Sequence, residues 1–228
     1  MYQSLKAMVF PLKVLISPFK TFREMAQNPQ VKGLVVVLAL ILVTTAGLQY
    51  VSATKIFLAQ QTSLLASNMF TGYMLSALRD TVLTFFVNWI IYACVLILLT
   101  KVFGGNARPW RTMFILVGYA FSVFIVRIVV TTVLISTLPV LHLAISTWPP
   151  ATQADYTVYL NQFNAVWAPT LASQMASFLI WIVYGWFVVL GAIAVHASTG
   201  ITRGKATIIS VIAYMINFIL SLFLPVML

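Results

Sequence analysis

Acidic residues are almost absent from this chain: its 228 residues include only Glu24, Asp80 and Asp155. Charged residues make up 7% of the sequence and hydrophobic residues 62%, whereas a soluble domain is about one quarter charged. Water would not solvate a globule of this composition, but lipid would. No paired carboxylates, nucleophile motif or zinc-protease motif occurs, so the sequence predicts no enzyme.

Cysteine and histidine are equally scarce. Cys94 is the single cysteine, so an intrachain disulfide and a cysteine metal site are excluded. The two histidines, His142 and His196, are predicted on opposite sides of a membrane without a carboxylate nearby, and no metal site is expected. We expect His196 to be a hydrogen-bonded histidine at the membrane interface, rather than a pH sensor. The sequence predicts no cofactor.

Long uncharged runs dominate the rest of the chain. A transmembrane helix needs about 20 mostly apolar residues. The sequence therefore predicts an all-α, polytopic membrane helical bundle, residues 33–228, preceded by a cytoplasmic arm, residues 1–32. The five predicted transmembrane helices cover roughly residues 33–51, 81–103, 112–138, 171–196 and 206–226.

Two connections, residues 52–80 and 139–170, are more polar than the predicted spans. Apolar residues recur in them at helical spacing, and the first includes Tyr73, Leu75 and Leu78. This pattern is typical of amphipathic helices that lie along the membrane interface. We expect short interfacial helices there, in addition to the five spans.

The arm is basic and carries helix signals of its own. Ser17-Pro18 predicts a helix start, and Asn28-Pro29 predicts its end. Aromatic residues recur on one side of this helix and cations on the other, which is typical of a helix on an anionic membrane surface. The alternative is a basic flank that only sets orientation. The residues predicted to contact lipid are Lys13, Phe19, Lys20, Phe22 and Arg23.

Lysine and arginine are distributed unevenly along the chain, whose net charge is +10. With five spans, five cations fall in the arm, three in the loop after the second span and two before the last. Only Lys55 and Arg79 fall in the opposite loops. Because cationic loops stay in the cytoplasm, we expect a cytoplasmic N-terminus and an extracytoplasmic C-terminus. No basic patch with interleaved aromatics appears, so no nucleic-acid partner is expected.

A few polar residues fall within the predicted spans. Arg127 lies inside the third span, and Asp80 lies at the outer start of the second. Three interpretations remain for Arg127: a pair with Asp80, snorkelling to the outer headgroups, or contact with an anionic substrate or lipid. Asn88 and Asn217 are expected to hydrogen bond across helices rather than bind a ligand.

Three short stretches resemble the Yip domain family, Ypt/Rab-interacting membrane proteins with five spans. The stretches are Ser17-Pro18-Phe19-Lys20-Thr21-Phe22 with the following Asn28-Pro29, then Gly118-Tyr119, and finally the loop from Thr199 to Ala206. The cytosolic Asp-Leu-Tyr-Gly-Pro type motif of eukaryotic members is missing, and Val123 stands where their Gly-Tyr motif continues to a proline. The chain is therefore similar to prokaryotic members, for which no Rab partner is expected.

The resemblance implies a helical scaffold or membrane-organising protein of a prokaryotic cell membrane. Its expected partners are anionic lipids at the arm, together with a protein partner or a second copy of the chain. The alternative is a transporter or channel component in which Arg127 lines an internal site. Ion-coupled transport usually places acidic residues mid-membrane, and the sequence has none there.

Overall fold

The structure is a computed structural model that describes residues 11, 13–57, 70–105, 110–142, 161 and 165–223. The chain divides into two compact units. Unit 1 comprises Met1–Ile41, Val82–Ile125 and Val183–Leu228, and unit 2 comprises Leu42–Thr81 and Val126–Ile182. The division passes through the long helices, so each unit contains parts of several of them.

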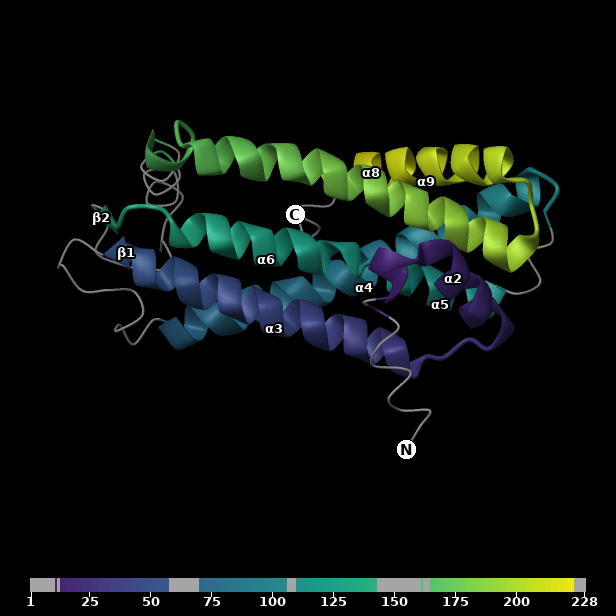
Figure 1. Ribbon diagram of the computed structural model, residues 1–228, viewed down its shortest axis with the longest axis horizontal. Coiled ribbons are helices and arrows are strands. Elements are labelled where there is room, and N and C mark those ends of the chain that lie inside the picture. Colours follow the sequence, from purple (N-terminus) through teal and green to yellow (C-terminus); the bar gives the residue numbers. More distant parts are fainter. Residues whose placement is uncertain are drawn as a thin grey trace. The chain divides into compact units, whose positions relative to one another are not determined.

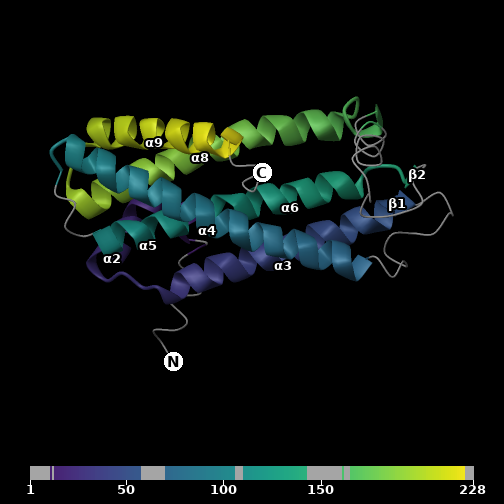
Figure 2. The ribbon, with the colours of Figure 1, turned by 180° about the vertical axis from the view of Figure 1, so that it is seen from behind.

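Helices make up nearly all of the described chain (Figures 1 and 2). Five stretches of the described residues are long and apolar enough to cross a membrane: α3, α4, α5 together with α6, α8, and α9. This confirms the predicted all-α bundle with five spans. The helices are α2 (Pro18–Gln27), α3 (Lys32–Lys55), α4 (Phe70–Val102), α5 (Trp110–Ala120), α6 (Val123–Ser136), α8 (Leu171–Thr199) and α9 (Arg203–Phe223).

The second span is longer than predicted. Its helix α4 begins at Phe70 and has 33 residues, about 50 Å at 1.5 Å per residue. Tyr73, Leu75 and Leu78 belong to this continuous helix, so the prediction of a separate interfacial helix is wrong for residues 70–80. The hydrocarbon layer of a membrane is about 30 Å thick. A helix satisfies its own backbone hydrogen bonds, so α4 can continue beyond this layer. Within the two predicted interfacial connections, residues 58–69, 143–160 and 162–164 lie outside the described residues.

The third span is interrupted, although the sequence predicts one helix there. Phe121 and Ser122 separate α5 from α6. The amides of Phe121 and Ser122 donate to the carbonyls of Gly118 and Tyr119, at 3.3 and 3.1 Å. These bonds to the third preceding residue tighten the chain into a turn of the 3₁₀ type.

Aromatic packing in unit 1 accompanies this interruption. The Phe121 ring centroid lies 5.2 Å from that of Phe85 in α4 and 5.0 Å from that of Phe187 in α8, both edge to face. Phe124 also packs on Phe187, with centroids 5.3 Å apart. The turn thus places two neighbouring rings of the third span against one ring of α8. No proline lies at the break, but Gly118 and Ser122 do, and glycine and serine are among the residues at which helices kink.

Two glycines determine how α4 ends. Gly104 has φ +77°, and the amides of Gly104 and Gly105 donate to the carbonyls of Lys101 and Thr100, at 3.1 and 2.9 Å. This is a Schellman end for α4, and glycine suits its left-handed position. A side chain at Gly105 would overlap Ile201, which shows that the α4 end contacts the turn before α9.

Three contacts join separate segments of unit 2. β1 (Ile56–Phe57) and β2 (Leu141–His142) form a short parallel pair, which the sequence did not predict. The ammonium of Lys55 donates to the carbonyl of Leu138, at 2.9 Å. The Tyr73 hydroxyl donates to the side-chain carbonyl of Gln49 and thereby ties α4 to α3.

Candidate functional site

The arm helix α2 is docked on α5 within unit 1, as Figure 1 shows. It begins at Pro18 and ends before Asn28, as the sequence predicts. Phe22 and Met25 have no exposed surface. Phe22 therefore does not face lipid in this structure, which corrects the sequence expectation for that residue. The apolar stripe of α2 is used to pack against a transmembrane helix.

The outward side of α2 remains available for contact with other molecules. Phe19 is 52% exposed, and Lys20 and Arg23 are exposed as well. The guanidinium carbon of Arg203, the first residue of α9, lies over the Phe19 ring at 5.4 Å from its centroid. This distance is typical of a cation–π interaction. Arg203 thus joins α2 to the start of α9.

Unit 1 carries a set of exposed cations that we call the cationic surface. They lie on α2, shortly before it, and at the ends of α3, α4, α5 and α9, which gather at one end of this unit (Figures 1 and 2). Among the described residues, none of these cations forms an ion pair with a carboxylate. The set is Lys13, Lys20, Arg23, Lys32, Lys101, Arg111, Arg203 and Lys205.

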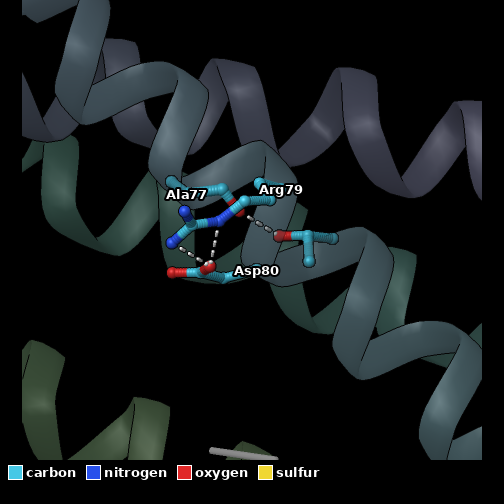
Figure 3. A network of polar contacts seen from close by, with 4 residues as sticks. Ala77, Arg79 and Asp80 are labelled. Atoms are coloured by element: carbon cyan, nitrogen blue, oxygen red, sulfur yellow. Dashed lines mark hydrogen bonds and ion pairs between the residues drawn. The ribbon is translucent and has the colours of Figure 1, made fainter. Parts of the chain in front are cut away.

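Asp80 forms an ion pair that differs from the predicted one. The Nη2 and Nε atoms of Arg79, its neighbour in α4, both lie 3.0 Å from Oδ1 of Asp80 (Figure 3). The two side chains are 70% and 58% exposed, so we expect the pair to contribute little to stability. The predicted pair between Asp80 and Arg127 is therefore wrong. Arg127 is half-buried in α6 of unit 2.

Gly118 and Tyr119, which carry part of the family resemblance, lie in the buried part of α5. The Tyr119 hydroxyl donates to the carbonyl of Gln30, at 3.1 Å, and a side chain at Gly33 would overlap its ring. A side chain at Gly118 would overlap Leu34. The Gly-Tyr pair therefore fixes the start of α3 against α5, which is a packing role.

Asn88 and Asn217 bond to one another, as the sequence predicts. The amide nitrogen of Asn217 in α9 donates to the side-chain oxygen of Asn88 in α4, at 3.1 Å. Asn88 also donates to the carbonyl of Thr84 within its own helix, at 2.9 Å. A bond of this kind between transmembrane helices contributes about 0.6 kcal/mol.

A second polar connection in unit 1 was not predicted from the sequence. Tyr92 in α4 lies with its hydroxyl 2.8 Å from that of Ser210 in α9. Ser210 in turn donates to the carbonyl of Val188 in α8, at 2.7 Å. A side chain at Gly191 would overlap the Tyr92 hydroxyl, so this glycine is the signal in the sequence that a buried group approaches α8.

His196 behaves as the sequence predicts. Its Nδ1 lies 2.6 Å from the carbonyl of Ile201, so the ring bonds the turn that joins α8 to α9. Gly200 in this turn has φ +71°. In the described part of the chain, no group of three or more histidine, cysteine or acidic side chains is placed to hold a metal ion.

These features define a polytopic membrane protein with an arm helix docked on its third span. A family model described as Yip1 domain matches residues 12–224, nearly the whole chain. The chain therefore belongs to the Yip1 domain family, which confirms the resemblance seen in its sequence. No curated protein and no solved structure matches it significantly.

Proposed function

We propose that the protein is a non-enzymatic membrane-organising scaffold that gathers anionic lipids at its cationic surface. In this proposal it sits in a prokaryotic cell membrane, with its N-terminus and cationic surface on the cytoplasmic side. The cytoplasmic leaflet attracts basic segments by about 1 kcal/mol per cation. The surrounding bilayer would thereby be enriched in anionic headgroups around one end of the protein.

The observation that supports this proposal is the separation of charge between the two units. Unit 1 contains ten of the 13 lysines and arginines and only one of the three acids, Glu24. Unit 2 contains the other three cations together with Asp80 and Asp155. Unit 1 is thus strongly positive, and its described cations are exposed. An uncompensated field of this kind concentrates counter-ions, which at a membrane surface are anionic headgroups.

Lipid analysis of the purified full-length chain tests the proposal. The protein is extracted in a mild detergent from membranes containing phosphatidylglycerol and phosphatidylethanolamine, and its bound lipids are quantified by mass spectrometry. We expect phosphatidylglycerol to be enriched over its share in the membrane. Replacing Lys101 and Lys205 by Gln should reduce this enrichment, by about fivefold for each charge if each contributes about 1 kcal/mol.

A matched variant in unit 2 provides the control. Lys55→Gln with Arg79→Gln also removes two positive charges, but from outside the cationic surface. This variant should retain the enrichment, and gel filtration should show both variants to be folded. Equal lipid composition in the protein and in the membrane would refute the proposal. An equal loss in the two variants would also refute it, since net charge alone would then account for lipid binding.

A further inference from the structure

We propose that the cationic surface contains one discrete site for the phosphate of an anionic phospholipid, built by Arg203, Phe19 and Arg23. The inference rests on the proposed function and names the site within it. A diffuse positive surface attracts any anionic lipid through net charge, whereas this site depends on the fixed position of one guanidinium group. The two cases give different results for the same substitutions.

The docking of α2 on α5 leaves the aromatic ring of this site, Phe19, on the outer side of the helix. Phe22 faces inward without exposed surface, whereas Phe19, three residues earlier, stays 52% exposed. Arg23 follows Phe19 by four residues, so the two side chains share one face of α2, one helical turn apart. Because packing of Phe22 holds α2 against α5, the backbone positions of Phe19 and Arg23 are fixed as well.

Arg203 completes the site from a different helix. Its guanidinium carbon lies over the Phe19 ring, 5.4 Å from the ring centroid, and among the described residues its side-chain N–H groups donate to no protein acceptor. A cation–π contact involves the charge of the guanidinium group and leaves the five N–H donors of its planar fork available for hydrogen bonds. Such a fork matches two oxygens of a phosphate group. Arg23 on the same face of α2 would add a second cation.

The depth of the site in the membrane favours a lipid phosphate as its ligand. Arg203 is the first residue of the candidate span Arg203–Leu220. A residue at the start of a span lies at the level of the headgroups. The positive end of the α9 dipole lies there too and adds a smaller contribution for an anion. The phosphate of a neighbouring lipid is the anion present at this depth.

Titration with lipid tests the site in the full-length protein in a zwitterionic detergent. Short-chain phosphatidylglycerol is added, and the rise in thermal midpoint gives its apparent affinity. We expect Arg203→Gln to weaken this affinity about tenfold, as loss of a charge-assisted hydrogen bond to phosphate does. Arg203→Lys keeps the charge but loses the planar fork, and it should weaken binding nearly as much.

Arg111→Gln is the comparator, because it removes one exposed arginine of the cationic surface that stacks on no ring in the described structure. It should weaken binding less than threefold, because the attraction of about 1 kcal/mol per cation belongs to an anionic bilayer surface, which the zwitterionic micelle lacks. Phe19→Leu keeps an apolar side chain but removes the aromatic face, and it should weaken binding more than Arg111→Gln and less than Arg203→Gln. Wild-type affinity in Arg203→Lys, or equal losses in Arg203→Gln and Arg111→Gln, would overturn the discrete site while leaving the diffuse surface in place.

Two further titrations distinguish an anionic lipid from a neutral lipid and from an acidic peptide. Short-chain phosphatidylcholine carries the same phosphate but no net charge, and it should bind at least tenfold more weakly than phosphatidylglycerol. A polyglutamate peptide offers carboxylates without a lipid. If this peptide raised the thermal midpoint and phosphatidylglycerol did not, an acidic protein segment would be the ligand and the lipid site would be refuted. If wild-type protein bound neither anion, the proposed function would fail with it.

Discussion

At the scale of single residues, glycines decide where the helices of unit 1 approach one another. Gly33 accommodates the ring of Tyr119, Gly118 accommodates Leu34, and Gly191 accommodates the hydroxyl of Tyr92. Gly185, in the same helix as Gly191, has open space where a side chain would begin. Small residues between membrane helices permit close backbone contact, but only some glycines here serve that purpose.

This contrast predicts different effects for two substitutions in α8. Gly191→Ala should destabilise the protein by about 1–3 kcal/mol, because the new methyl group overpacks a filled site beside Tyr92 and Ser210. Gly185→Ala should be neutral or stabilise by up to about 1 kcal/mol, since alanine favours the helix more than glycine does. Thermal unfolding in one detergent measures both. Equal midpoints for the two variants would contradict the close packing of α4, α8 and α9.

Some of these contacts could be predicted from the sequence and others could not, for a physical reason. Asn88 and Asn217 stand out because amides are costly in lipid unless they are bonded, so their pairing could be predicted. Tyr92 and Ser210 are common in membrane helices and carry no such signal. Their bond joins residues 118 positions apart, which only the tertiary arrangement reveals.

At the scale of elements, the sequence predicts where α2 begins and ends but not which part of the molecule it contacts. Its limits follow from Pro18 and from Asn28-Pro29, and these could be predicted because proline restricts its own and the preceding residue. Its apolar stripe was expected to meet lipid. An apolar stripe alone does not say whether lipid or another helix covers it, and here α5 covers it.

Two substitutions in α2 test this docking. Phe22→Ala should destabilise the protein by about 3–5 kcal/mol, as for other fully buried phenylalanines. Phe19→Ala should cost clearly less, since half of its surface is exposed and its cation–π contact with Arg203 contributes about 0.5–1 kcal/mol. Trypsin should then cleave after Lys20 and Arg23 faster in Phe22→Ala than in Phe19→Ala. Similar cleavage of the two variants would show that α2 is not held by α5.

The interruption of the third span was not predicted from the sequence. Its residues from Trp110 to Ser136 are apolar enough to read as one uninterrupted crossing. No proline marks Phe121 and Ser122, and hydropathy does not register a helix that tightens locally. The break is associated with rings from α4 and α8, and such contacts between segments that are distant in sequence are not visible in hydropathy.

At the scale of the whole molecule, the positive charges follow the division of the fold into two units. The sequence places ten cations in the arm and two loops, and all ten belong to unit 1. Hydropathy located the five spans, but it could not locate this unit, which is assembled from three separate stretches of the chain. The cationic loops meet because their helices pack together, as Ile201 against Gly105 shows.

This division predicts the orientation of the chain in the membrane. Reporters inserted after Gly105 and after Gly200 should lie in the cytoplasm, because the cationic loops that flank them resist translocation. A reporter after Gln153 should lie outside, since an odd number of spans separates it from each of the other two. A fluorescent protein and alkaline phosphatase, inserted at each position in turn, report the two compartments. Phosphatase activity after Gly105, or fluorescence after Gln153, would contradict a cytoplasmic cationic surface, and the lipid site at Arg203 would then face the wrong leaflet.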